Sequence, residues 1–243
     1  MSSLEAKKIT PATGTSVTLG TSGDAVSVPS DVTLKTNTMK DAGGNTIFTS
    51  NGSGTLSNVN TGLAGSMVLI SSQTASSSAS ISFTKGLDST YEEYVFFFVN
   101  IHPATNAEFL QFQSSIDGGA SYGVNLTSTA FSAYHAESGA DGTLTYTTAR
   151  DLANSTLWQY LTSGIGADEN DQNACGELHL YAPSSTTYVK QWNSRTNTYE
   201  ASDFTQSYYM GGYFNTTSAI DAIRFQMTNG NIDDGTIYLY GIK

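Results

Sequence analysis

The aromatic residues divide this chain into two physically different regions. Before Tyr91 the only aromatic residues are Phe48 and Phe83, whereas both tryptophans, all fourteen tyrosines and all three histidines lie from Tyr91 onward. Aromatic side chains supply large apolar areas to a core, so the second region is equipped to build one and the first is not. We therefore expect a folded C-terminal domain that carries a thin N-terminal segment.

The N-terminal region, residues 1–70, has only short stretches of alternating apolar residues, such as Val17 with Leu19 and Val26 with Val28. Alternation this brief, broken by glycine and proline, predicts short strands. One such strand is expected at Ile47-Phe48, between turns. So few apolar side chains cannot offset an ordering cost of roughly 1–2 kcal/mol per residue. We expect this region to pack against copies of itself, to dock on a partner, or to stay flexible.

The polar tract at 71–80 is expected to be a linker, and residues 81–243 are expected to form the folded domain. Only residues 151–162 offer a plausible short helix. Strand candidates with apolar or alternating patterns, often bounded by turn residues, lie at 91–101, 109–116, 131–136, 177–182, 187–192, 207–214, 222–227 and 236–242. So many strands predict an all-β fold: an antiparallel β-sandwich or jelly roll.

Charge and cysteine content argue against several classes of protein. Ten Lys and Arg against twenty-one Asp and Glu give a formal net charge of -11, which would repel a phosphate backbone, so we expect no nucleic-acid partner. The single cysteine, Cys175, allows no intrachain disulfide. We find no apolar run of signal-peptide or membrane-spanning length, and therefore expect synthesis in a cytoplasm without membrane insertion.

The residues that usually carry catalysis are scattered. His102, His135 and His179 show no metal-ligand spacing, and no G-x-S-x-G motif occurs. The acidic residues at 167–173 and at Asp233-Asp234 could offer oxygen ligands to Ca²⁺, but they match no EF-hand spacing, and we favour solvated loops. We therefore expect no enzyme activity, no cofactor and no metal.

An aromatic cluster is the most suggestive feature for binding. Its members, which offer rigid apolar faces with polar tips, include Trp192, Tyr208, Tyr209 and Tyr213. Three interpretations remain open: alternate members fill the core, they form an interface between subunits, or they make a ligand platform.

Two stretches of the chain resemble known proteins. Residues 8–29 (KITPATGTSVTLGTSGDAVSVP) are similar to the head of bacteriophage fibre and appendage proteins, especially of marine and cyanobacterial podovirus-like phages. Residues 211–215, 219–227 and 230–243 resemble the terminal hairpin of such virion proteins, and 113–122 (QSSIDGGASY) lies between the two ends. The resemblance implies a component of the virion surface, commonly a homo-oligomer and often a trimer.

Together these features favour a non-enzymatic structural protein. We expect an oligomeric phage appendage, either a short tail fibre or a capsid or neck decoration, which contributes to host attachment. Its N-terminal segment would trimerise or bind other virion proteins, and its sandwich would contact a host surface glycan through many weak sites. The alternative is a carbohydrate-binding or polysaccharide-acting β-sandwich.

Overall fold

The structure, a computed structural model, describes residues 37–50, 53, 56–57, 59 and 66–243. The chain forms two compact units, Met1–Leu63 and Ala64–Lys243, and each is considered by itself. All regular elements of the described residues are β-strands. None of these residues belongs to a helix long and apolar enough to cross a membrane.

The first unit contains a small three-stranded antiparallel sheet, β1 (Thr38–Lys40), β2 (Thr46–Ser50) and β3 (Leu56–Ser57). Asp41 closes the turn between β1 and β2, because its Oδ1 accepts hydrogen bonds from the backbone N–H of Gly43 and Asn45. The strand expected at Ile47-Phe48 is confirmed as part of β2. No described residue of this unit is buried. The expected strands around Val17 and Val26 lie outside the described residues.

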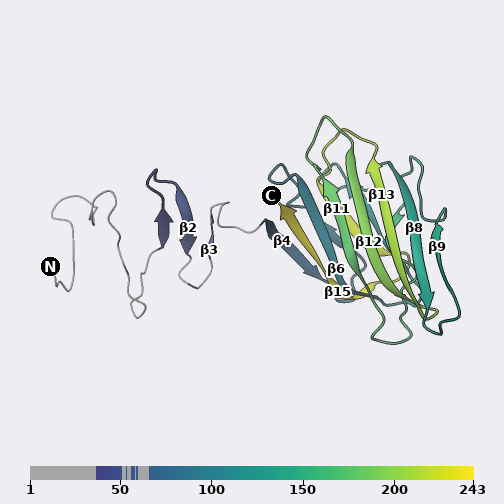
Figure 1. Ribbon diagram of the computed structural model, residues 1–243. Coiled ribbons are helices and arrows are strands. Elements are labelled where there is room, and N and C mark those ends of the chain that lie inside the picture. Colours follow the sequence, from purple (N-terminus) through teal and green to yellow (C-terminus); the bar gives the residue numbers. More distant parts are fainter. Residues whose placement is uncertain (1–36, 51–52, 54–55, 58, 60–65) are drawn as a thin grey trace, which may run out of the picture. The chain divides into compact units, whose positions relative to one another are not determined.

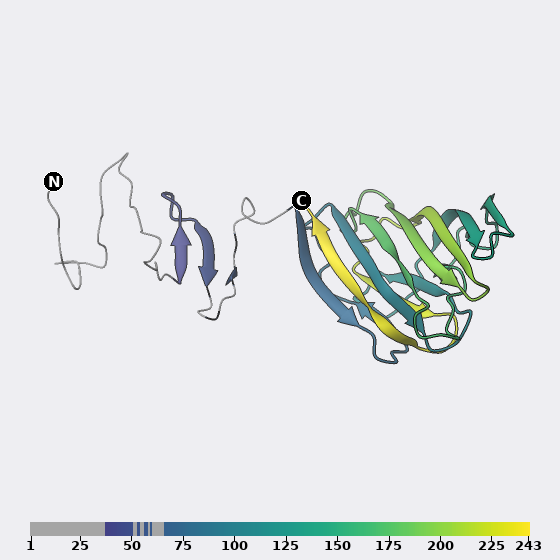
Figure 2. The ribbon, with the colours of Figure 1, turned by 60° about the horizontal axis from the view of Figure 1, so that its bottom comes forward.

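The second unit is built on a large antiparallel sheet, in the order β4-β15-β6-β11-β12-β13-β8-β9. Figure 2 shows this order, with the yellow β15 between β4 and β6. Its strands are β4 (Met67–Thr74), β6 (Glu93–Pro103), β8 (Leu126–Ala136), β9 (Gly142–Tyr146), β11 (Ala174–Tyr181), β12 (Lys190–Glu200), β13 (Phe204–Phe214) and β15 (Ile232–Ile242).

A second antiparallel sheet packs against one face of the large sheet (Figure 1). Its order is β10-β7-β14-β5, and its strands are β5 (Ile81–Phe83), β7 (Leu110–Ser115), β10 (Gln159–Tyr160) and β14 (Ala222–Met227). Aromatic rings from both sheets meet between them: Phe225 lies 5.3 Å from Phe96, and Phe112 lies 5.2 Å from Trp192, centroid to centroid. The unit is therefore a β-sandwich, as the sequence predicts, while the strand order does not establish a jelly roll.

Two predictions about this unit are wrong. The tract at 71–80 is not a linker, because β4 runs through it to Thr74 and pairs with β15. Its polar side chains fit the edge of a sheet, where backbone pairing on one side suffices. The segment at 151–162 is not a helix either. It pairs with both sheets, because Ser155 and Leu126 exchange backbone hydrogen bonds and Leu161 N–H donates to the carbonyl of Leu110.

Candidate functional site

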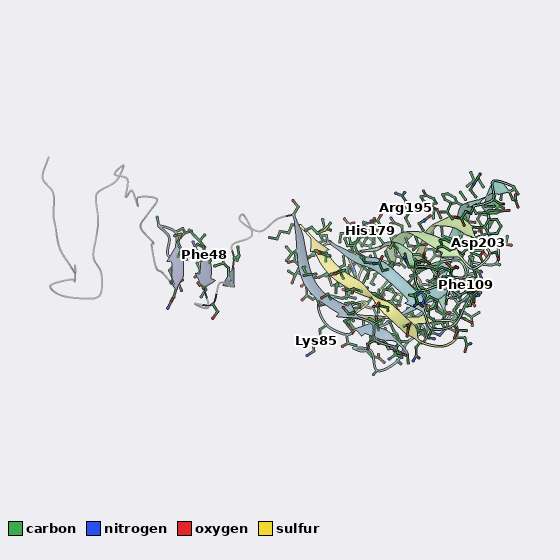
Figure 3. All side chains as sticks on the ribbon, turned by 90° about the horizontal axis from the view of Figure 1, so that it is seen from below. Phe48, Lys85, Phe109, His179, Arg195 and Asp203 are labelled. Atoms are coloured by element: carbon green, nitrogen blue, oxygen red, sulfur yellow. The ribbon has the colours of Figure 1, made fainter. Side chains whose placement is uncertain are left out.

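The large sheet has two faces with different surroundings. The inner face packs on the small sheet, and its side chains belong to the hydrophobic core. The small sheet covers only this side, so the other side of the large sheet is open (Figure 2). Figure 3 shows His179 and Arg195 along one side of the sandwich and Lys85, which follows β5 of the small sheet, on the opposite side.

Aromatic side chains gather on the open side of the large sheet. Residues paired in register on neighbouring strands share one face, and one such row crosses seven strands: Tyr238, Phe97, Glu177, Arg195, Tyr209, Phe131 and Tyr146. Six strand spacings of about 4.8 Å make this row roughly 29 Å long. Tyr240 lies on the same face in the next row, and Tyr181 and Tyr213 lie on it one row further. We call these eight aromatic residues, from Phe97 to Tyr240, the outer aromatic face.

The rings of this face pack on one another along the row. Phe131 and Tyr209 stack with their centroids 5.1 Å apart and their planes 7° from parallel. The guanidinium carbon of Arg195 lies 5.6 Å from the centre of the Tyr209 ring. Phe131 remains 45% exposed and Tyr146 53% exposed. Stacked rings present their rims to solvent, so the surface is broad and amphipathic and lacks a deep slot.

Charged side chains lie at the centre of this face, where Glu177 and Arg195 stand in the central row and Glu93 lies near them. At its centre His179 lies between two carboxylates, with Nδ1 2.6 Å from Glu93 Oε1 and Nε2 3.7 Å from Glu177 Oε2. Uncharged amides fill other positions, and Asn193 Nδ2 donates to the hydroxyl of Tyr181 at 2.9 Å. Enrichment in tyrosine, with asparagine and arginine among the polar groups, is typical of contact surfaces.

One end of the outer side opens into a cavity of about 300 Å³, lined by residues of β8, β12 and β13 and by the turn that joins β12 to β13. The hydroxyl of Tyr199 lies there, 3.2 Å from both Glu137 Oε2 and Asp203 Oδ1. Burial of the phenol, together with the carboxylates of Asp203 and Glu137, raises the pKa of Tyr199 to about 12. The phenol therefore stays neutral and donates to one carboxylate at a time.

The structure separates the four candidate residues of the aromatic cluster. Trp192 and Tyr208 are 2% and 4% exposed and belong to the core. Predicting them as ligand contacts is wrong, because they present no surface to a ligand. Tyr209 and Tyr213 are partly exposed on the outer aromatic face. The core interpretation thus holds for two members of the cluster and the surface interpretation remains for the other two.

The acidic segments considered for Ca²⁺ do come together. Asp171, Asn173, Asp233 and Asp234 line one polar cavity of about 490 Å³, with Asn100 and His102. His102 Nδ1 lies 2.6 Å from the carbonyl oxygen of Gln172. Within residues 66–243 and the described part of the first unit, no three acidic, histidine or cysteine side chains are grouped closely enough to hold a metal ion.

Neither His102 nor His179 contacts a serine, threonine or cysteine side chain in the described part of the chain. His102 Nδ1 contacts the carbonyl oxygen of Gln172, and His179 contacts Glu93 and Glu177. The absence of enzyme activity stays a prediction.

The aromatic residues of the outer aromatic face can be found in the sequence, but they do not form one cluster along it. Phe97 and Phe131 come from strands far from the Tyr208-Tyr209 pair, and only the register of β6, β11, β12, β13 and β8 brings them into one row. Alternation along each predicted strand sorts its side chains into two faces. Which of these faces is the outer one can be decided only when the position of the second sheet is known.

Comparison of the chain with protein-family models, with curated proteins and with solved structures found no match.

Proposed function

We propose that this chain is a structural protein of a bacteriophage particle, an oligomeric surface appendage that contributes to attachment to the host cell. The likeness of residues 8–29 and 211–243 to phage appendage proteins supports this proposal. The division into a first unit with a small three-stranded sheet and a second unit that forms a β-sandwich also supports it. A short tail fibre and a capsid or neck decoration both fit this description.

The observation that carries the proposal is the outer aromatic face. It is about 29 Å long and combines ring rims with tyrosine hydroxyls and amides, as in the Tyr181 and Asn193 pair, around a central group of charged side chains that includes Glu177 and Arg195. An extended surface of this kind suits a polymer rather than a small molecule. Since the chain has a formal net charge of -11, a strongly anionic polymer would be repelled. The ligand proposed for this face is an uncharged stretch of host surface polysaccharide.

Because each contact of this kind is weak, firm attachment to a cell needs several copies of the sandwich. The first unit has no buried residue among those described, and association of three copies would bury apolar side chains that one copy leaves in water. A homotrimer would then present three sandwiches, and binding to other virion proteins through the first unit would array them on the particle. Each added sandwich raises the effective concentration of the next one at the cell surface.

Size-exclusion chromatography with light scattering on the full chain tests the assembly, and immunogold labelling of particles tests the location. A trimeric mass with gold on the particle is the expected result, at the tail tip for a fibre and uniformly over the capsid for a decoration. A strictly monomeric protein that never co-purifies with particles would contradict the proposal.

The same face supports a second candidate, a polysaccharide-acting or carbohydrate-binding β-sandwich that works outside a virion. The cavity beside Tyr199, with Glu137 and Asp203, is where acidic side chains adjoin the outer side. Incubation with capsular or cell-wall polysaccharide, followed by measurement of new reducing ends, separates the two functions. Release of reducing ends would favour the enzyme, and glycan retention without release would favour a binding protein.

A further inference from the structure

Another pocket lies against the outward face of the small sheet. Its volume is about 280 Å³, and its walls include Gln111 of β7, Tyr160 of β10, and residues of the segment that joins β9 to β10. Hydrogen bonds hold this segment in place, because Gln113 Nε2 donates to the carbonyl of Thr156 and Gln159 Nε2 donates to that of Arg150, both at 2.8 Å. The pocket is therefore a built feature of the fold.

Arg150 lines this pocket and is held in place by two aromatic rings. Its guanidinium carbon lies 4.2 Å from the centre of the Phe109 ring and 4.8 Å from that of Tyr160, and these two rings stack 5.4 Å apart (Phe109 is labelled in Figure 3). Aromatic rings attract a guanidinium through cation–π interactions. Two rings on one guanidinium fix its position without using any of its N–H donors.

The hydrogen-bond donors of Arg150 have no acceptor. Nε is buried without a partner, and neither terminal nitrogen forms a hydrogen bond within the described part of the chain. No carboxylate there lies within 4.0 Å of it, although the chain has twenty-one acidic residues. Arg224 differs, because its Nε donates to Ser82 Oγ at 3.0 Å. Arg150 is thus positioned in advance with donors unused.

The other walls of the pocket narrow the class of ligand. Trp158 offers an aromatic surface, and Leu157, which is 66% exposed, offers an apolar one. Asp151 adds a carboxylate, whose Oδ2 already accepts a hydrogen bond from the Tyr146 hydroxyl at 2.6 Å. This acidic side chain disfavours a compact inorganic anion, but it accepts hydrogen bonds from hydroxyl groups.

We propose that this pocket binds an acidic sugar residue, such as a hexuronic acid, through a carboxylate on Arg150. A guanidinium binds a carboxylate through paired, charge-assisted hydrogen bonds. The apolar face of the sugar ring packs on Trp158 and Leu157, and its hydroxyl groups donate to Asp151. The other acidic groups of the chain weaken this attraction little once they lie beyond about 8 Å at physiological salt. The pocket is lined by residues outside the outer aromatic face and meets that face at the hydrogen bond from Tyr146 to Asp151. The proposal rests on Arg150 and does not depend on the proposed function.

Ligand-detected NMR and isothermal titration of the full chain test this site with glucuronate, glucose, acetate and inorganic phosphate. We expect glucuronate to bind at least tenfold more tightly than glucose, because glucose has no carboxylate, and more tightly than acetate, which has no ring. Binding of glucose or phosphate as tight as that of glucuronate would overturn the proposal, as would the absence of glucuronate binding at millimolar concentration.

Two arginine variants localise the binding. Arg150→Met keeps an apolar stem against Phe109 and Tyr160, and it should weaken glucuronate binding at least tenfold while glucose binding stays the same. The matched control is Arg224→Met, since Arg224 also lies over a tyrosine ring, with its guanidinium carbon 3.9 Å from the centre of the Tyr122 ring, and does not line this pocket; it should leave glucuronate binding unchanged. An equal loss in both variants would contradict the site. If Arg150→Met fails to fold, the comparison of glucuronate with glucose on the unmodified chain still decides.

Discussion

Tyr208 and Tyr209 are neighbours in β13, yet they belong to different environments. Tyr208 is 4% exposed in the core, and Tyr209 stacks on Phe131 on the outer aromatic face. The same contrast extends across the large sheet: both faces are rich in aromatic residues, but only the inner one is covered by a second sheet. An inner ring is retained because it fills space. An outer ring gains far less from folding, so its place on the surface calls for another explanation, which we take to be contact with a ligand.

We expect the largest difference between the two faces from a substitution at Phe225, which lies at the centre of the inner aromatic cluster. Four phenylalanine rings lie within 5.2–6.3 Å of it, those of Phe83, Phe96, Phe98 and Phe112. Phe225→Ala should lower the free energy of unfolding by about 3–5 kcal/mol, because it removes apolar contacts and leaves a cavity. Urea denaturation measures the loss. Phe131→Ala on the outer aromatic face is the matched control, and a loss as large as that of Phe225→Ala would contradict the assignment of faces.

Two adjacent glycines in β13 also differ in their surroundings, because Gly212 faces the covered inner side of the sheet and Gly211 faces the open outer side. A Cβ on Gly212 would lie 2.4 Å from the carbonyl oxygen of Thr127 and 2.9 Å from the Trp192 ring, whereas a Cβ on Gly211 would have no atom closer than 3.8 Å. Gly212→Ala should therefore destabilise the protein by roughly 1–3 kcal/mol, and Gly211→Ala should be close to neutral. Thermal unfolding of the two variants checks this, and equal melting temperatures would refute the placement of Gly212 on the inner face.

Lys190, on the inner face, should make the stability of the folded state depend on pH. Its side chain is fully buried, and Nζ donates to the carbonyls of Tyr188 and Thr216. Burial lowers the pKa of Lys190 below its usual value of 10.5. The unfolded chain then binds more protons than the folded one as pH rises toward 10.5, so this residue makes the folded state gain stability with rising pH. In urea titrations, the stability of the unmodified chain relative to Lys190→Met should rise with pH; a difference that stays constant would argue against this burial.

Tyr199, on the outer side, should have the opposite effect on the pH dependence of stability. The pKa of Tyr199 is raised to about 12, whereas an unfolded tyrosine titrates near 10.0. The folded chain keeps this proton while the unfolded chain loses it, so the contribution of Tyr199 is present below pH 10 and is lost as pH rises toward 12. Tyr199→Phe should therefore lose less stability between pH 10 and pH 12 than the unmodified chain, and urea titrations of both proteins over this range measure the difference. Identical pH profiles would show that the two carboxylates do not act on Tyr199.

The sequence predicts the strands whose inward residues are apolar, and it fails where polarity and burial disagree. The bounds of β14 match the predicted 222–227, because this strand is buried and apolar. The prediction of 187–192 misses most of β12, which continues to Glu200 with Ser194, Thr196 and Thr198 turned inward and buried. Alternation of hydrophobicity cannot reveal a strand whose inward residues are Ser and Thr.

The candidate sites could be predicted only in part. A run such as Tyr208-Tyr209-Met210 is aromatic and apolar on both faces, so the sequence cannot say which tyrosine faces inward until the small sheet is in place. Nothing near Arg150 in the sequence marks a pocket. Its aromatic partner Phe109 directly precedes β7, and its partner Tyr160 lies in β10. The pairing of these two strands brings the two rings together.

The most direct test of the outer aromatic face as the contact surface is competition for host cells with the double variant Phe131→Ser/Tyr209→Ser. Under the proposed function, a phage carries this chain, and purified unmodified protein should block adsorption of that phage. The double variant should not block it, although it keeps the same oligomeric mass and nearly the same melting temperature. A variant that falls apart into monomers would show that a second copy covers this face. A folded, oligomeric variant that blocks adsorption as well as the unmodified protein would contradict the central claim.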